Sequence, residues 1–457
     1  MNFVQLEYPI FLTAIVSIIA MTRSLSLRKA ITLAASYYFY AYWDYRFLGL
    51  LVASTIFDYL IGLALHRATS TSIRKSLLLL SIFGNLGVLG FFKYYNFFIE
   101  SAEAIFSRWG LGGGTLAILL PIGISFYTFQ TLSYSIDVYR RKILPCRSLL
   151  DFAIYVSFFP QLVAGPIVRA SEFLPQLDAA PVVNRQHLYD GAMQVFRGFL
   201  KKVLIADHLA VFVDPVFASP TVFSSLTILL AIVAYTGQIY GDFSGYSDIA
   251  IGSARMLGFD LPENFRHPYL STSIADFWRR WHITLSTWLR DYLYIPLGGN
   301  RHGSPRTYLN LMATMILGGL WHGAAWTFVL WGVWHGAALC LMRSSNSSRR
   351  GSLLSGIITF AIVVFGWTLF RATSLENWGE LMGSLLTNAR GFQWTPPAAM
   401  LALTILILEH AIWSSRYQDV LLLKPDRWYT PWIVGFGLAA LLLFAPQSSK
   451  PFVYFQF

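Results

Sequence analysis

The sequence is short of charge and of cysteine. Only 12% of its 457 residues are charged, whereas 55% are hydrophobic. A soluble domain usually carries about a quarter charged residues, so this supply cannot cover a water-facing surface of this size. The two cysteines, Cys146 and Cys340, support neither a disulfide framework nor a zinc site. These shortages exclude a large soluble domain and a disulfide-stapled scaffold.

Signatures of several enzyme classes are missing as well. No histidine is followed by aspartate in the His-x4-Asp spacing of glycerolipid acyltransferases, and neither HExxH nor GxSxG occurs. The net charge of +11 suggests nucleic acid, but the basic residues are scattered between apolar runs and form no single stripe. We therefore expect no metal site, no bound cofactor and no nucleic-acid partner.

Long apolar runs fill the chain and raise its mean hydropathy to +0.53. Many approach the roughly 20 residues that a helix needs to cross a bilayer. They predict an all-α polytopic membrane protein, with residues 1–457 forming a single membrane-embedded domain. The first run lacks a basic leader and a cleavage site, which favours a retained helix. The expected spans are 8–21, 30–46, 48–65, 76–95, 115–138, 150–168, 222–241, 305–319, 321–341, 352–370, 397–413 and 430–446. Residues 185–215 and 242–300 are more polar and predict partly buried or re-entrant elements.

Lysine and arginine are concentrated in alternate loops, which predicts the orientation. The richer set, expected in the cytoplasm, is Arg23, Arg28, Lys29, Arg67, Arg74, Lys75, Arg140, Arg141, Lys142, Arg147, Arg343, Arg349, Arg350, Arg416, Lys424 and Arg427. The poorer set is Arg46, Arg108, Arg371, Arg390 and Lys450. Both termini then face outside.

Residues 271–301, STSIADFWRRWHITLSTWLRDYLYIPLGGNR, predict an amphipathic helix too charged to span lipid. Ser273 and Asp276 resemble a capping box at its start. His282 falls on the apolar arc, away from the arginines. It is either a hydrogen-bonded core histidine or a functional group, and a buried ionisable residue in a membrane bundle favours function.

Two Trp-His-Gly triplets lie in residues 318–336, GGLWHGAAWTFVLWGVWHG. If 321–341 is one helix, His322 and His335 lie roughly 20 Å apart on nearly opposite faces and cannot form one site. Small residues after His322 leave room for a substrate. His335 is as well explained as a neighbour of Trp334 at the membrane interface.

These stretches together resemble the membrane-bound O-acyltransferase family, and within it the branch that acetylates bacterial exopolysaccharides. The likeness extends over most of the chain through ASYYFYAYWDYRFLGLL (35–51), LPIGISFYTFQTLSYSIDVYR (120–140), FFPQLVAGPIVR (158–169) and DFSGYSDIAIGSARMLGF (242–259). It implies a bundle of about 11–13 transmembrane and re-entrant helices around a central tunnel, with the catalytic region at about 242–341. The two active-site histidines of the family correspond to His282 and His322.

The resemblance implies an acyl relay in the bacterial inner membrane. The donor is expected to be cytoplasmic acetyl-CoA and the acceptor an exopolysaccharide such as alginate or cellulose, reached through a periplasmic acetyltransferase of the SGNH type and a polysaccharide synthesis complex. His322 would act as general base, or as an acyl carrier, and His282 would orient or polarise the thioester carbonyl. The residues expected to contact substrate are Trp281, Arg279, Arg280, Asp291, Trp321 and Trp326.

Three alternatives stay open from the residues alone. They are D-alanyl or other acyl transfer to a cell-envelope polymer, a transporter or flippase without covalent chemistry, and a scaffold that recruits a secreted enzyme. If His282 and His322 serve one thioester, their rings should lie within roughly 10 Å of each other.

Overall fold

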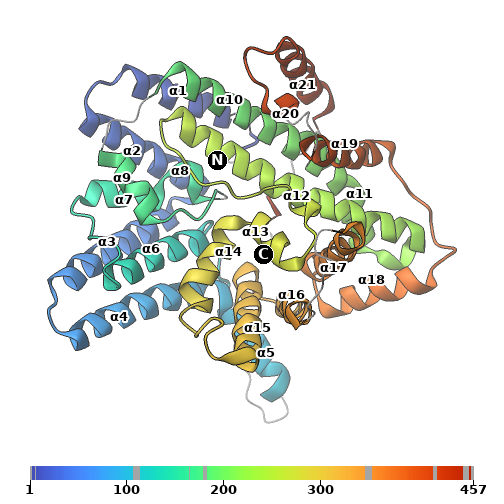
Figure 1. The fold of residues 1–457 in the computed structure, drawn as a ribbon, viewed down its shortest axis with the longest axis horizontal. Coiled ribbons are helices and arrows are strands. Elements are labelled where there is room, and N and C mark those ends of the chain that lie inside the picture. The colour runs from blue at the N-terminus through green and yellow to red at the C-terminus, as the bar shows by residue number, and fades with distance from the viewer. Residues whose placement is uncertain are drawn as a thin grey trace. The chain divides into compact units, whose positions relative to one another are not determined.

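A computed structural model describes residues 3–5, 7–106, 114–163, 165–178, 183–344, 352–414, 419–445 and 452–453. The described residues are mostly helical, with no β-strand among them (Figure 1). The all-α membrane architecture expected from composition is therefore confirmed. Five of the lysines and arginines counted for the orientation lie outside the described residues, namely Arg108, Arg349, Arg350, Arg416 and Lys450.

The chain divides into two compact units, residues 1–192 with 250–262, and residues 193–249 with 263–457. The prediction of a single domain stays a prediction. The helices of the first unit are α1 (Glu7–Met21), α2 (Leu25–Asp44), α3 (Arg46–Arg67), α4 (Thr71–Leu89), α5 (Tyr95–Phe106), α6 (Ile124–Tyr139), α7 (Leu149–Ser157), α8 (Phe159–Leu162) and α9 (Ala170–Asp178), with a π-helical turn, η1 (Gly90–Tyr94), between α4 and α5. Two helices, α10 (Arg185–Phe199) and α12 (Ser225–Met256), contribute to both units.

A buried carboxylate joins three helices of the first unit. Asp58 on α3 accepts hydrogen bonds from Ser81 (2.7 Å) and Asn85 (2.8 Å) on α4. Ser135 on α6 adds a third at 3.2 Å. Because the buried carboxylate is held by three donors, its cost in an apolar interior is offset and it ties α3, α4 and α6 together.

The second unit carries the sequence-predicted site. Its helices include α11 (Asp207–Ala218), α13 (Ile274–Arg280), α14 (Ile283–Leu289), α15 (Gly303–His322), α16 (Trp326–Ser344), α17 (Leu353–Arg371), α18 (Leu375–Thr387), α19 (Pro397–Trp413), α20 (Asp419–Leu422) and α21 (Thr430–Phe444). Short π and 3-10 turns are η3 (Leu200–Ala206), η4 (Pro220–Val222), η5 (Pro268–Leu270) and η6 (Arg290–Tyr294).

Helices α15 and α16 follow each other after a short turn and pack tightly as a hairpin. A Cβ on Gly319 would lie 2.2 Å from the backbone oxygen of Phe328, and one on Gly332 would lie 2.5 Å from that of Met315. Glycine at both positions therefore allows the two backbones to touch.

Long apolar runs were predicted well and interrupted ones less well. Among the described residues, four helices are long and apolar enough to cross a membrane: Arg46–Arg67, Thr71–Glu103, Ser225–Met256 and Leu353–Arg371. The shorter apolar helices α1, α19 and α21 also match predicted spans. The predicted span 115–138 is helical only from Ile124. The span predicted at 150–168 is broken at Phe158, which separates α7 from α8.

Three other predictions need correction. The helix predicted to end near residue 241 continues to Met256, because most of the polar residues in its second half are buried inside the protein and do not face lipid. The amphipathic helix of 271–301 is two helices, since the chain turns at Trp281 and His282. Residues 321–341 are not one helix: α15 ends at His322 and α16 begins at Trp326.

Candidate active site

His282 lies in the turn between α13 and α14 and is completely buried. The predicted cap upstream is present, because the Ser273 hydroxyl accepts a hydrogen bond from the backbone N–H of Asp276 at 3.1 Å. Helix α13 ends at Arg280, and His282 adopts φ 41° and ψ 56°, in the left-handed region. Non-glycine residues seldom occupy this region, so the surrounding structure must hold the imidazole in place.

Asn264 provides that support. Its side-chain oxygen lies 3.1 Å from Nδ1 of His282 and accepts hydrogen bonds from Thr284 through the backbone N–H (3.3 Å) and the hydroxyl (2.9 Å). The Thr284 amide can only donate, which identifies this Asn264 atom as oxygen. Nδ1 of His282 is therefore the protonated nitrogen, and in the neutral ring Nε2 is the acceptor. Burial lowers the pKa of His282 to about 3, which favours this neutral form.

His322 is the last residue of α15 and is 4% exposed. Its ring contacts Trp331 of α16 at a centroid distance of 5.1 Å and Phe370 of α17 at 5.2 Å. Gly323 follows it, and a Cβ there would lie 2.1 Å from the Phe328 ring. The small residue after His322 therefore makes room for a neighbouring aromatic ring of the protein.

One indole connects the two histidines. The Trp321 ring lies 6.0 Å from His282 and 5.1 Å from His322, so the two imidazole centroids are at most about 11 Å apart. Phe243 covers His282 from α12 at 4.7 Å. The two imidazoles that the sequence singled out therefore share one buried aromatic cluster.

His335 departs from its prediction. It is fully buried, and neither ring nitrogen has a hydrogen-bond partner within the part of the chain that the structure describes. Its ring lies 4.9 Å from Trp331, which also contacts His322. The expectation that His322 and His335 sit on opposite faces of one helix is wrong, because α15 ends at His322 and the hairpin brings its ring to Trp331, which lies one turn before His335 on α16.

The residues predicted to contact substrate are only partly brought to this cluster. Trp281 and Trp321 are buried beside the histidines, and Trp281 packs on Trp367 at 4.8 Å. Arg280 pairs with Asp276 within α13 at 3.0 Å, and Asp291 pairs with Arg290 at 2.7 Å. Two further predicted residues are exposed, namely Arg279 and Trp326.

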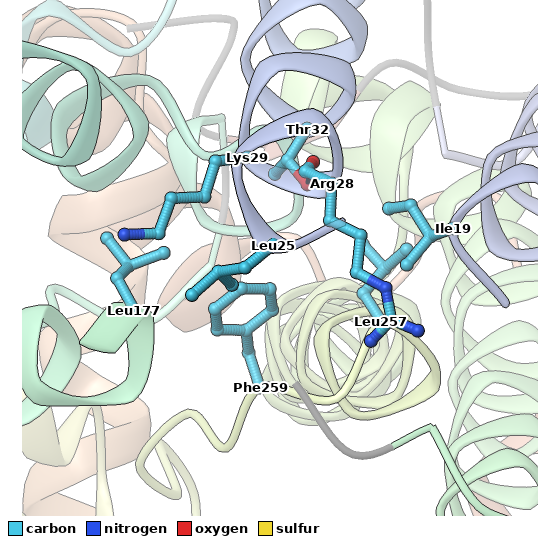
Figure 2. A pocket seen from close by; sticks show the side chains of 8 residues that line it. All are labelled: Ile19, Leu25, Arg28, Lys29, Thr32, Leu177, Leu257 and Phe259. Carbon is cyan, nitrogen blue, oxygen red and sulfur yellow. Dashed lines mark hydrogen bonds between the residues drawn. The ribbon is translucent and has the colours of Figure 1, made fainter. Parts of the chain in front are cut away.

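A surface pocket lies elsewhere, in the first unit (Figure 2). Its lining is Ile19, Leu25, Arg28, Lys29, Thr32, Leu177, Leu257 and Phe259. Lys29 is engaged by Asp151 at 2.8 Å. None of the predicted site residues lines this pocket, so it does not enter the assignment of the active site.

Sequence reasoning missed Asn264 and did not place His335 in the buried aromatic cluster. Asn264 had no signal, because its role depends on the chain returning to His282 through a backbone bond from Ile283 N–H to its carbonyl. His335 did have a signal, since its triplet repeats that of His322. Because residues 321–341 were treated as one helix, the sequence did not show that His322 and His335 share Trp331 as a neighbour.

Comparison with known proteins supports the same chemistry. Residues 33–369 match the membrane-bound O-acyltransferase (MBOAT) family. A probable alginate O-acetylase AlgI of Pseudomonas putida is 42% identical, covering 94% of each chain. That of Pseudomonas aeruginosa is 48% identical over 76% of this chain and 68% of its own. A peptidoglycan O-acetyltransferase of Helicobacter pylori is 37% identical over 75% of this chain and 71% of its own.

The chain belongs to the MBOAT family. It is a membrane-embedded O-acyltransferase, which sets aside the transporter, flippase and scaffold alternatives.

Proposed function

We propose that this protein takes an acetyl group from cytoplasmic acetyl-CoA and passes it across the bacterial inner membrane for O-acetylation of an exopolysaccharide such as alginate. The relatives named for alginate O-acetylation support this substrate class. The observation that carries the proposal is the pair of buried imidazoles, His282 and His322, each next to the Trp321 ring.

His322 is the proposed general base. The acceptor hydroxyl attacks the thioester carbonyl carbon, and the carbon–sulfur bond breaks. The hydroxyl proton passes to the imidazole of His322 and then to the departing CoA thiolate. A water-excluded aromatic site suits this step, because charge that develops there interacts more strongly than in water.

The hydrogen-bond pattern changes the role expected for His282. A histidine that polarises a carbonyl must donate an N–H to it, but the donor of neutral His282 is directed at Asn264. Nε2 is an acceptor and suits a hydrogen bond from the acceptor hydroxyl or from an amide N–H of the pantetheine arm. We assign His282 to substrate orientation on this basis.

A separate periplasmic acetyltransferase of the SGNH type, working with the polysaccharide synthesis complex, is the proposed next carrier. This partner follows from the resemblance to exopolysaccharide-acetylating relatives.

Reconstitution tests the assignment. Purified protein in vesicles, with labelled acetyl-CoA and the periplasmic partner, should transfer label to polymer. His322→Ala should lower the rate at least about 100-fold, the scale of a lost general base, without lowering membrane abundance. His66→Ala, at an exposed position, is the control and should match the wild type.

The double variant tests the pairing. If both imidazoles act on one transition state, His282→Ala with His322→Ala should be scarcely slower than His322→Ala alone. Full activity of His322→Ala would overturn the proposed function. Strictly additive losses would leave His322 as base and reduce His282 to a structural residue.

A further inference from the structure

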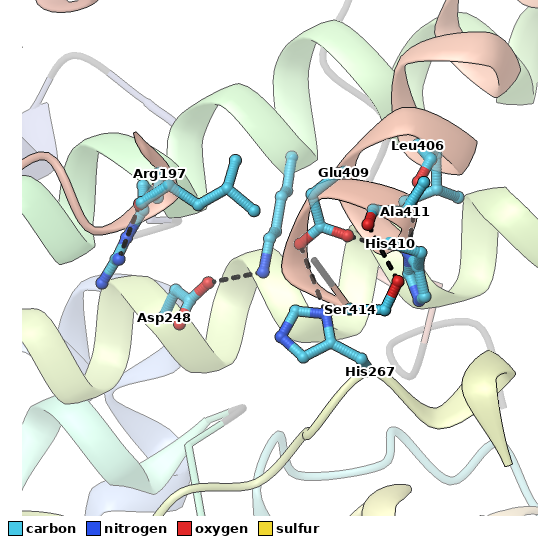
Figure 3. Close-up of polar contacts among 10 residues, drawn as sticks. Arg197, Asp248, His267, Leu406, Glu409, His410, Ala411 and Ser414 are labelled. Atoms are coloured by element: carbon cyan, nitrogen blue, oxygen red, sulfur yellow. Dashed lines mark hydrogen bonds and ion pairs between the residues drawn. The ribbon is translucent and has the colours of Figure 1, made fainter. Parts of the chain in front are cut away.

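A second group of ionisable side chains lies in the second unit, apart from the proposed catalytic pair. His267 precedes η5, and Glu409 and His410 occupy the last turn of α19 (Figure 3). Nδ1 of His267 lies 3.8 Å from one carboxylate oxygen of Glu409, and Nδ1 of His410 lies 2.8 Å from the other. One ligand-type atom from each residue can be chosen so that all lie within 4.8 Å of one another.

The backbone holds His267 in an unusual conformation. Its φ is 45°, in the left-handed region. Its ring stacks on Trp413 at 4.2 Å with an interplanar angle of 22°, and only 8% of the residue is exposed. Strained residues that are firmly packed are often functional, so the placement of this imidazole needs a reason.

His410 is oriented as a ligand would be. Its Nδ1 lies 3.2 Å from the carbonyl oxygen of Leu406, one turn earlier in α19. Histidines that bind metals commonly donate their second ring N–H to a backbone carbonyl, which directs the other nitrogen to the ion. Nε2 of His410 is buried and has no hydrogen-bond partner among the described residues, and the same holds for Nδ1 of His267.

We infer that His267, Glu409 and His410 form a binding site for a divalent transition-metal ion, with Zn²⁺ the ion that best suits the donors. Two imidazoles and one carboxylate are a common zinc ligand set, and three protein ligands leave a fourth position for water. Zinc holds such donors at about 2.0–2.2 Å, so tetrahedral donors lie about 3.3 Å apart. The present donors lie within 4.8 Å of one another, so the side chains must close by up to about 1.5 Å around the ion.

A nearby cation, Lys201, does not neutralise the Glu409 carboxylate. Lys201 is the positive group close to Glu409, and its ammonium is bonded to Asp248 at 2.9 Å. Its charge is thus offset by a carboxylate outside the cluster. The Glu409 carboxylate stays available to balance the charge of a bound ion.

The ion would fasten a segment that also supports the catalytic cluster. His267 lies shortly after Asn264, whose oxygen bonds His282, in the stretch that joins α12 to α13. Metal binding itself is independent of the proposed function. Its effect on acyl transfer, by holding this segment against α19, rests on that function and makes the three ligands positioning residues.

The test measures metal rather than activity. Full-length protein, purified in detergent through a tag without histidines and stripped with a chelator, is titrated with ZnCl₂. We expect about one tightly bound Zn²⁺ per chain, and Co²⁺ in its place should give the visible absorption of a four-coordinate site. Glu409→Gln and His410→Ala should each weaken binding at least tenfold. His410→Cys should retain it, because a thiolate is also a zinc ligand.

His302→Ala is the matched control, since His302 is exposed and lies outside the cluster. Wild-type protein that binds no stoichiometric Zn²⁺ would overturn the site, and would mean that the cluster only shares protons between two imidazoles and a carboxylate. Unchanged affinity in monodisperse Glu409→Gln would also overturn it. Neither result depends on acyl transfer, so the two proposals fail separately.

Discussion

A single side-chain oxygen organises the turn that carries His282. Asn264 is 1% exposed, and its oxygen is close to three donors from His282 and Thr284. Its amide nitrogen donates to the Ser247 hydroxyl at 3.3 Å. An oxygen in this position fixes both the ring orientation of His282 and the tautomer, and so decides which nitrogen is directed away from Asn264 toward the proposed substrate.

Asn264→Ala should therefore slow acyl transfer more than it harms the fold. Groups that orient a functional histidine typically contribute about 10–100-fold. The donors left without an acceptor should also reduce stability by about 1–3 kcal/mol. Initial rates and melting temperature in detergent check both effects. Thr284→Val removes one donor but leaves the Asn264–His282 bond, so a rate loss as large as that of Asn264→Ala would contradict the positioning role.

At the scale of elements, the α15–α16 hairpin brings His322 of α15 to Trp331 of α16, the helix that also carries His335. The hairpin depends on backbone contact at Gly319 and Gly332, because any side chain there meets the opposing main chain. Helices that approach through small residues are common in membrane proteins. Precise placement of His322 at the end of α15 follows from this contact.

Gly319→Ala should separate the two helices and lower both stability and activity. Its new Cβ would lie 2.2 Å from a backbone oxygen, and overpacking of this kind typically costs about 1–3 kcal/mol. Thermal unfolding followed by tryptophan fluorescence measures the change. Gly379→Ala in α18 is the comparison, because nothing lies within 4 Å of its Cβ and alanine favours the helix. Equal melting temperatures for the two variants would show that the hairpin tolerates the added methyl group.

The elements also show what the sequence could and could not predict. Helices α1, α3, α17, α19 and α21 were predicted because each is an apolar run of helical length. The full length of α12 was not, because composition alone does not show whether a polar residue faces lipid or a partner. Asp242 on α12 is paired with Lys202 at 2.7 Å and accepts the Val453 N–H at 2.7 Å. Such pairing lets a helix with buried charge continue through the interior.

The residues of the candidate site also divide into those that the sequence identified and those that it did not. His282 and His322 were identified from short motifs, and their common neighbour Trp321 belongs to one of them. Asn264 was not identified, because its role depends on a return of the chain to His282. His335 was placed at the membrane interface, because the hairpin that makes Trp331 a common neighbour of His322 and His335 was not predicted. The break at His282 was missed for a related reason: its left-handed backbone is imposed by tertiary contacts that a helical periodicity does not contain.

At the scale of the whole molecule, the uneven distribution of lysine and arginine predicts which loops face the cytoplasm. Lys142 and Glu376 are exposed and lie in regions predicted for opposite sides. Because acetyl-CoA, the proposed donor, is charged and does not cross lipid, the proposed direction of acyl transfer depends on this orientation.

Cysteine labelling checks this predicted orientation of the loops. In a Cys146→Ser, Cys340→Ser background, Glu376→Cys should react with a membrane-impermeant maleimide in intact spheroplasts. Lys142→Cys should react only after permeabilisation, because the basic loops are retained inside. Maleimide applied to detergent-solubilised protein confirms that both thiols are reactive. The reverse pattern in spheroplasts would invert the predicted topology and the direction of transfer.

The left-handed backbone of His282 also makes this position suited to chemical complementation. Glycine adopts φ 41° without the steric cost that alanine meets, so His282→Gly can lose the imidazole while keeping the turn. The space left between Phe243 and Trp321 has the shape of the missing ring. Free imidazole added to that variant would then restore transfer if the ring contributes chemistry, and would do nothing if His282 only holds the turn together.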